Sequence, residues 1–162
     1  MPSSPSPYRS LPAERRISLV AHSIKESKES RAHYVQRLAE RPGGFRAVTL
    51  RTWPVERLAR EVVRVGAESA VDELDLLQSL YVDLEPAIQI TFLDAAGVGH
   101  AGGSINDTLE PPYADAETVR RAAAAVVDQH GEDGVRYLRT LARYNLAAWP
   151  GIDAVAAEVA AQ

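Results

Sequence analysis

Apolar residues recur three or four positions apart along most of the chain, which is the period of an amphipathic helix. The first stripe predicts one long helix over residues 11–41, ended by the run Pro42-Gly43-Gly44. Residues 45–51 are short and isolated, so we expect an extended connection there. A second helix is expected to begin near Thr52-Trp53-Pro54 and to end at Gly66.

The most hydrophobic helix of the chain follows, with an apolar face that ends at Ile88. Pro86 must kink or break this helix, because its ring clashes with the carbonyl four residues back. Asp115 is predicted to cap a helix that runs to about residue 129 and is ended by Gly131. Two further helices are expected over residues 132–146 and after Trp149. The pattern therefore predicts an all-α fold, a bundle of six or seven helices built around residues 71–96.

Two segments lack a helical period. Residues 1–10 are rich in serine and proline and are predicted to form a disordered tail, which leaves residues 11–162 as a single helical domain. Residues 97–115 contain four glycines and two prolines and are expected to form a long loop. Loops of this length are uncommon in compact domains and are often functional.

Composition narrows the classes of function. The chain has 162 residues, a formal net charge of −4 and no cysteine, which excludes disulfides, thiolate nucleophiles and cysteine-ligated metals. Basic residues are seen only as pairs and not as a stripe, so we expect no nucleic-acid partner. The longest apolar run is far too short to span a membrane, and the N-terminus lacks the apolar stretch of a signal peptide. We therefore expect a cytoplasmic protein.

A polar stripe on the first predicted helix carries residue types that can bind metal. His22, Glu26, Glu29 and His33 follow one another at spacings of 4, 3 and 4, which places them on one face of a continuous helix. Imidazoles and carboxylates at this spacing can chelate a divalent cation. The alternative is a solvated helix face, and it is favoured because a metal site also needs burial and supporting hydrogen bonds. No cofactor is predicted.

The glycine-rich loop holds the second candidate. Gly97, Gly99 and Gly102 have the spacing of a dinucleotide-binding motif, but no helix is predicted to open after them, so that interpretation is disfavoured. His100 lies among these glycines, with Asp94 and Asp107 near enough in sequence to orient its ring as a general base. The alternative is a histidine that only bonds the backbone of a loop.

Residues 92–100, the Glu110-Pro111-Pro112 run and the hairpin that ends in Trp149-Pro150-Gly151 resemble uncharacterised bacterial all-helical proteins of unassigned function. The resemblance covers about residues 75–152 and implies a bacterial, all-helical protein, with no activity or site residue. With no recognisable nucleophile or cofactor motif, we predict a helical protein-interaction or assembly module that forms a homodimer or other homo-oligomer. The alternative hypothesis is a small-ligand or metal-binding helical enzyme that uses the His100 loop or the histidine–glutamate stripe.

Overall fold

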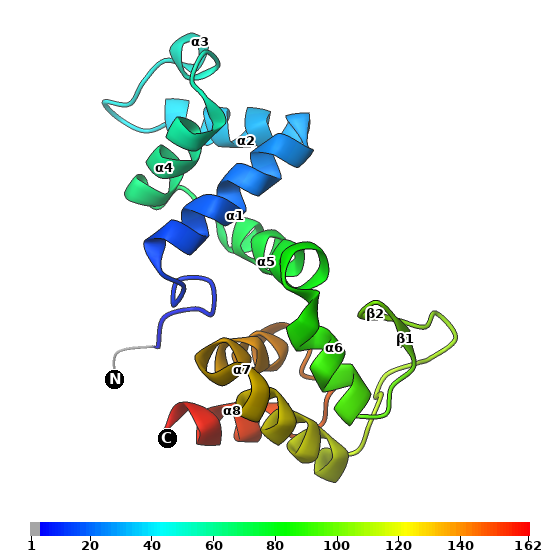
Figure 1. Ribbon diagram of the computed structural model, residues 1–162. Coiled ribbons are helices and arrows are strands. Elements are labelled where there is room, and N and C mark those ends of the chain that lie inside the picture. The colour runs from blue at the N-terminus through cyan, green and yellow to red at the C-terminus, as the bar shows by residue number, and fades with distance from the viewer. Residues whose placement is uncertain (1–3) are drawn as a thin grey trace. The chain divides into compact units, whose positions relative to one another are not determined.

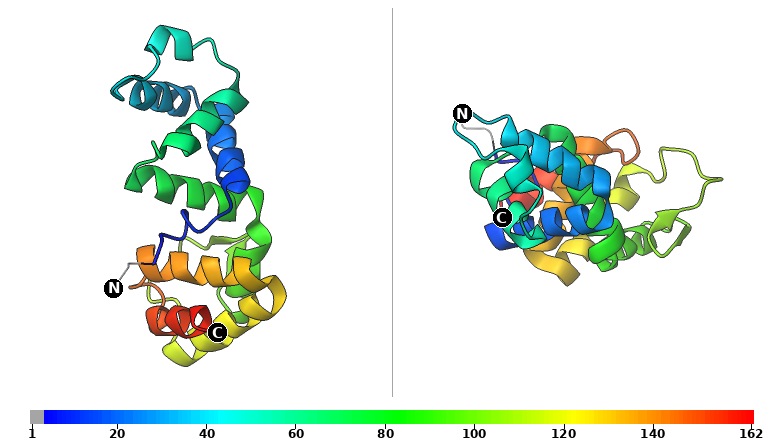
Figure 2. Two further views of the ribbon diagram at one scale, coloured as in Figure 1. Left: turned by 90° about the vertical axis from the view of Figure 1, so that its left-hand side faces the viewer. Right: turned by 90° about the horizontal axis from the view of Figure 1, so that it is seen from above.

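The computed structural model describes residues 4–162 and confirms the all-α class. Eight α-helices and one π-helix occur among these residues, where six or seven helices are expected, together with one two-stranded sheet. The chain divides into two compact units, Met1–Ser79 and Leu80–Gln162. Figures 1 and 2 show the order of the helices from the N-terminus to the C-terminus.

The first unit contains five helices: α1 (Ala13–Glu26), α2 (Lys28–Ala39), α3 (Ala47–Leu50), α4 (Val55–Val65) and α5 (Ala70–Ser79). Helix α1 packs mainly against α4, and also against α2 and α5. The buried apolar faces of these helices form the core, which includes Val20, Leu58, Val62 and Leu77.

The predicted long helix over residues 11–41 is in fact two helices, α1 and α2. Ser27 separates them, with an extended backbone at φ −144° and ψ 123°, and its Oγ accepts a hydrogen bond from the Ser30 backbone N–H. A serine side chain can accept a hydrogen bond from a backbone N–H in the first turn of a helix, and this favours serine as an N-cap over a position inside a helix. Ser27 therefore caps α2 and does not continue α1. The residues around Ser27 are polar, so no apolar face there favours a single continuous helix.

The N-terminal segment differs from the expected tail. Tyr8 has a side chain with no solvent exposure, and Leu11 is also buried. The Tyr8 hydroxyl donates a hydrogen bond of 2.5 Å to Oε2 of Glu68, and the Arg9 guanidinium donates one of 2.9 Å to the Glu68 carbonyl. Residues 1–3 lie outside the described part of the chain.

Residues 45–51, expected to be extended, contain the one-turn helix α3 instead. The turn before it depends on two glycines. Gly43 has a φ of +72°, and a Cβ on Gly44 would lie 2.8 Å from the Leu38 carbonyl oxygen. The chain therefore closes tightly against the end of α2 before α3 begins.

The second unit contains the π-helix η1 (Leu80–Leu84), α6 (Pro86–Ala95), β1 (His100–Ala101), β2 (Ser104–Ile105), α7 (Ala116–Tyr144) and α8 (Ile152–Ala160). Helix α7 packs against both α6 and α8. Edge-to-face aromatic contacts join α6 to α7 and to the connection before α8, since the Phe92 ring centroid lies 5.8 Å from that of Tyr137 and 4.8 Å from that of Trp149.

Two predicted helix breaks are confirmed. Pro86 is the first residue of α6, and the turn before it is the π-helix, in which the Glu85 N–H bonds the Leu80 carbonyl oxygen. Gly131 takes the non-helical values φ 56° and ψ −130° and kinks α7. Beyond the kink, a Cβ on Gly134 would lie 2.6 Å from the Val126 carbonyl oxygen, so only glycine allows the two arms of α7 to meet so closely.

The start of α7 agrees with its predicted cap. Asp115 Oδ1 accepts a hydrogen bond of 2.8 Å from the Thr118 backbone N–H. The loop before it, over residues 97–115, is not wholly irregular, because β1 and β2 form a short antiparallel hairpin that pairs His100 with Ile105. From residue 106 to residue 112 the loop is exposed throughout.

Candidate functional site

The structure brings His100 and Asp94 together. His100 begins the hairpin and Asp94 lies near the end of α6, with 2.6 Å between His100 Nε2 and Asp94 Oδ1. The other ring nitrogen, Nδ1, accepts a hydrogen bond of 3.0 Å from the Gly103 backbone N–H. Asp107 is exposed beyond β2 and forms no hydrogen bond with His100. Of the two acids proposed for this histidine, only Asp94 of α6 is in contact with it.

Both ring nitrogens of His100 are engaged, which fixes the tautomer. Because Nδ1 accepts a hydrogen bond, the neutral ring carries its proton on Nε2 and donates it to Asp94. A general base or a metal ligand needs a free nitrogen lone pair. His100 has none in this arrangement, so its observed hydrogen bonds are those of a residue that holds the hairpin turn against the end of α6.

The polar stripe on the first helix is divided by the break at Ser27. His22 and Glu26 lie on α1, whereas Glu29 and His33 lie on α2. Spacings of 4, 3 and 4 place four side chains on a common face only in a continuous helix, which these residues do not form. Among residues 4–162, no group of three or more histidine, aspartate or glutamate side chains is placed to hold a metal ion.

His33 has a different partner from the one the stripe implies. Its Nε2 lies 2.8 Å from Oδ1 of Asp72 on α5, and Asp72 in turn caps that helix together with Ser69. The pair borders an open cavity of about 330 Å³, which Tyr34 and Asp75 also line. Burial, and next the negative charge of Asp72, raise the pKa of Tyr34 above its ordinary value. This pair ties α2 to α5 and leaves the cavity with an acidic wall.

A second feature of the first unit was missed in the sequence. Residues 41–64 contain six arginines against two glutamates, in a chain whose net charge is −4. All six arginines are exposed: Arg41, Arg46, Arg51, Arg57, Arg60 and Arg64. Because no two are adjacent, they do not form a recognisable basic run, although all six belong to the first unit.

Aromatic side chains lie among these arginines. Phe45 is 47% exposed, and its ring meets the buried Trp53 ring edge-to-face at 4.7 Å. The guanidinium carbon of Arg57 lies 3.8 Å from the centroid of Trp53, which is a cation–π distance. We define the arginine–aromatic surface as Arg41, Phe45, Arg46, Trp53 and Arg57.

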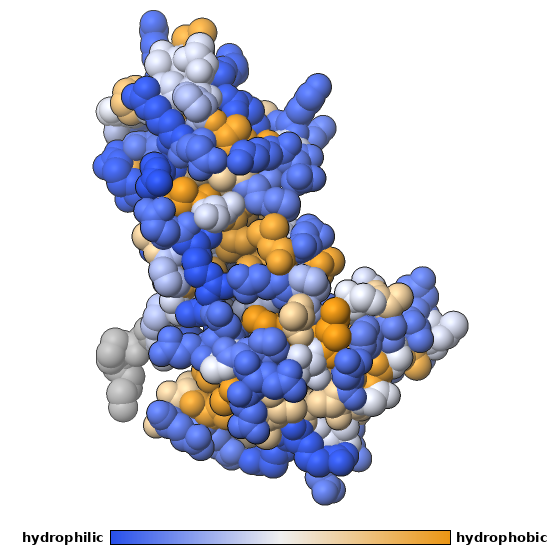
Figure 3. All heavy atoms as spheres, in the orientation of Figure 1, coloured by the Kyte–Doolittle hydropathy of each residue, from blue (hydrophilic) through white to orange (hydrophobic). Residues whose placement is uncertain are grey.

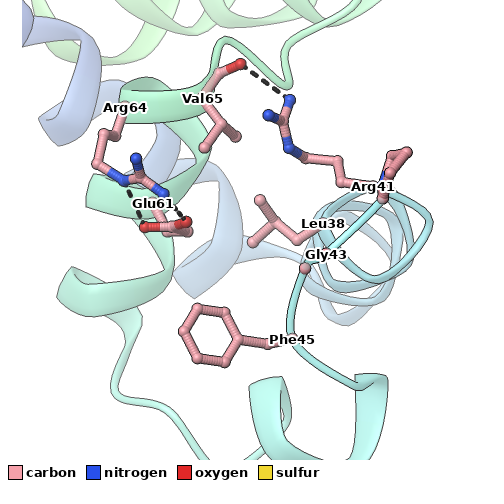
Figure 4. Close-up of a pocket in the computed structure, with 9 residues that line it drawn as sticks. Leu38, Arg41, Gly43, Phe45, Glu61, Arg64 and Val65 are labelled. Atoms are coloured by element: carbon pink, nitrogen blue, oxygen red, sulfur yellow. Dashed lines mark hydrogen bonds and ion pairs between the residues drawn. The ribbon is translucent and has the colours of Figure 1, made fainter.

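Figure 4 shows the cavity at one side of this surface, where Phe45, Leu38 and Val65 point toward a common space between the loop and α4. Its volume is about 190 Å³. The Arg41 guanidinium donates a hydrogen bond of 3.1 Å to the Val65 carbonyl oxygen. The cavity thus has apolar side chains on one wall, and its rim carries Arg41 and the Glu61–Arg64 ion pair.

The arginines differ in their ion pairs. Arg60 pairs with Glu14 and Arg64 pairs with Glu61, whose pKa is lowered first of all by its hydrogen bond with Arg64. Within the described residues, the other four form no ion pair with a carboxylate: Arg41, Arg46, Arg51 and Arg57. Their charge is therefore available to a partner.

The two units carry opposite charge. Residues 1–79 contain 13 basic and 10 acidic side chains, a formal charge of +3, whereas residues 80–162 contain 5 and 12, a formal charge of −7. Figure 3 shows apolar residues interspersed among hydrophilic ones on the face that it presents. The modest net charge of the whole chain hides this separation.

Comparisons with protein-family models, with curated proteins and with solved structures found no match to this chain. Among residues 4–162, no helix is both long enough and apolar enough to cross a membrane. Any functional assignment therefore depends on the chemistry of the residues described above.

Proposed function

We propose that this chain is a helical protein-interaction module that binds an acidic segment of a protein at its arginine–aromatic surface. The proposal depends on one observation: the half-exposed Phe45 ring meets Trp53 edge-to-face, near Arg41 and Arg57, which have no carboxylate partner among the described residues. We further propose that it acts in the cytoplasm as part of a homo-oligomer.

The chemistry of the surface favours a protein partner. Tryptophan, tyrosine and arginine dominate the binding energy of protein interfaces, and charged groups around them set the choice of partner. Phe45 and the neighbouring cavity provide apolar area to bury, while Arg41 and Arg57 provide positive charge. A peptide that carries an aliphatic side chain between carboxylates complements both properties.

The alternative, a small-ligand or metal-binding enzyme, has weaker support. His100 uses both ring nitrogens within its own hairpin and its neighbour Asp94, and the stripe of His22, Glu26, Glu29 and His33 is interrupted at Ser27. His33 directs one ring nitrogen to a carboxylate, and its other ring nitrogen forms no hydrogen bond within residues 4–162. It lacks a neighbouring nucleophile with a defined contact, so it does not define a reaction.

Isothermal titration calorimetry of the full chain tests the proposal. The probes are an acetylated Asp-Glu-Leu-Glu-Asp peptide, its basic counterpart Lys-Arg-Leu-Arg-Lys, and a short oligothymidine of similar charge to the acidic peptide. We expect saturable binding of the acidic peptide alone, which weakens at high ionic strength because the arginines are exposed.

The variant Phe45→Ala/Arg57→Ala should lose this binding. The matched control is Val71→Ala/Lys28→Ala, which removes an exposed apolar residue and a cation elsewhere in the same unit. Binding of the oligothymidine in preference to the peptide would overturn the proposal, because it would assign the arginines to phosphate recognition. Equal binding by the Phe45 variant and its control would also overturn it.

A further inference from the structure

The second unit carries an exposed acidic segment that complements the arginine–aromatic surface. Residues 107–117, which we call the acidic loop, contain four acidic side chains and no basic one: Asp107, Glu110, Asp115 and Glu117. Asp115 is engaged in capping α7, whereas the other three form no ion pair within the described residues. Leu109 lies between the first two acids and is 40% exposed.

The backbone of this loop is suited to docking. From residue 107 to residue 112 it forms neither helix nor strand, and every residue is exposed. The two prolines, Pro111 and Pro112, limit the conformations of the free segment and so reduce the entropy lost when it is ordered on a partner. The loop therefore presents Leu109 between Asp107 and Glu110 on a backbone that takes no part in the sheet or the helices of the second unit.

We propose that the acidic loop of one copy of this chain docks on the arginine–aromatic surface of a second copy. Leu109 enters the cavity beside Phe45, and Asp107 and Glu110 pair with Arg41, at the rim of that cavity, and with Arg57, which lies on the Trp53 ring. The inference rests on the proposed function, for which it names the partner. It is supported by the opposite formal charges of the two units, +3 and −7, which attract when unlike units of two copies meet.

The contact joins two different surfaces, so it is heterologous. Each copy has one acidic loop and one arginine–aromatic surface, and a third copy can add to either free end. The assembly therefore grows with concentration or closes into a ring, unlike a two-fold dimer, which stops at two copies. This difference gives the test its sharpest readout.

Sedimentation velocity on the full chain tests the inference with two variants. The surface variant is Phe45→Ala/Arg57→Ala, and the loop variant is Leu109→Ala/Glu110→Ala. Both variants change only exposed or half-exposed side chains, and the packing contact that they remove with Arg57 is its contact with the Trp53 ring. We therefore expect circular dichroism to show intact helices. We expect the wild-type chain to associate as its concentration rises and each variant alone to remain monomeric.

An equimolar mixture of the two variants is the decisive sample. The intact loop of the surface variant can dock on the intact surface of the loop variant, and no further contact remains. We therefore expect a 1:1 dimer that grows no larger. The control pair Leu146→Ala/Asp153→Ala, on exposed residues of the second unit outside the loop, should associate like the wild type.

Other outcomes overturn the inference. A wild-type chain that stays monomeric at all concentrations excludes docking between copies. Docking of the loop within its own chain would give this result and would equally overturn the inference. If the Asp-Glu-Leu-Glu-Asp peptide still binds such a chain, the proposed binding of an acidic protein segment stands, whereas the proposed partner and the proposed homo-oligomer are wrong. If that peptide does not bind either, both fail. A mixture that remains monomeric, beside a wild type that associates, assigns self-association to another surface.

Discussion

Tyr8→Phe should destabilise the first unit although it removes a single atom. Tyr8 is fully buried, and its hydroxyl donates to the Glu68 carboxylate, whose side chain has no solvent exposure. Burial, followed by the hydrogen bond with Glu68, raises the pKa of Tyr8 above its ordinary value, so the hydroxyl remains a donor. Glu68 Oε1 accepts no hydrogen bond from the described residues and lies 3.6 Å from Arg9 Nη1.

The size of the effect follows from these contacts. Phenylalanine keeps the buried ring, so the loss is limited to one hydrogen bond to a charged acceptor. Such a bond contributes about 1.5–3 kcal/mol, and a carboxylate left with fewer partners in the interior adds to the loss. We expect Tyr8→Phe to lower the free energy of unfolding by about 2 kcal/mol. For a unit of this size, that lowers the melting temperature by about 10 °C.

The two tryptophans allow each unit to be followed separately. Trp53 belongs to the first unit and Trp149 to the second. In a Trp149→Phe background, tryptophan fluorescence during urea unfolding reports the first unit alone. Tyr144→Phe, in the second unit, is the matched control, because Tyr144 is partly exposed and its hydroxyl forms no hydrogen bond within residues 4–162. It should change the free energy of unfolding by less than about 0.5 kcal/mol.

A double-mutant cycle with Glu68→Gln identifies the cause. If the hydroxyl stabilises the unit because its acceptor is charged, Tyr8→Phe should lower the free energy of unfolding less in the Glu68→Gln background than in the wild type. A Tyr8→Phe variant as stable as the wild type would refute the reasoning. It would mean that the Tyr8 hydroxyl does not stabilise the buried Glu68, and that residues 4–10 behave like the tail predicted from the sequence.

Three further changes test individual contacts in the second unit. Gly134→Ala places a Cβ 2.6 Å from the Val126 carbonyl oxygen and should cost about 1–3 kcal/mol in urea unfolding; an unchanged midpoint would show that the kink of α7 adapts. His100→Ala removes the acceptor of the Gly103 N–H, so hydrogen exchange at that amide should accelerate while helix amides keep their rates; general acceleration would contradict a local role. The hydrogen bond from the Thr118 backbone N–H lowers the pKa of Asp115. The Asp115 carboxylate therefore stabilises α7 above about pH 3.8, and this stabilisation is lost as the pH falls through the lowered pKa. Asp115→Asn should remove this pH dependence from the helical circular dichroism signal, and a variant whose signal follows pH as in the wild type would contradict the cap.

The sequence predicts the class of the fold because its apolar positions follow the helical period over most of the chain. Breaks set by backbone geometry were also predictable, since Pro86, Gly131 and the Asp115 cap act through local chemistry. The break at Ser27 was not, because a serine within a polar stretch fits both a continuous helix and a new cap. Tyr8 was missed for another reason: its burial depends on Glu68, which is 60 residues away.

The candidate sites show the same division. His100 and Asp94 are six residues apart, so their contact follows from local sequence. The His33–Asp72 pair joins residues 39 apart and could not be read from spacing along one helix. Phe45 and Arg57 meet at the Trp53 ring only once the segments before and after α3 are folded. A regional charge count over residues 41–64 was the signal that could have revealed it.

The central claim is that unlike surfaces of two copies bind through exposed charge and a shared apolar contact. Sedimentation velocity of the wild-type chain over a concentration series, at about 0.01 M and about 0.5 M ionic strength, tests it most directly. The account predicts that the average mass rises with concentration at low ionic strength and returns toward that of the monomer at high ionic strength. A monomer under every condition, or an association that salt leaves unchanged, would contradict it.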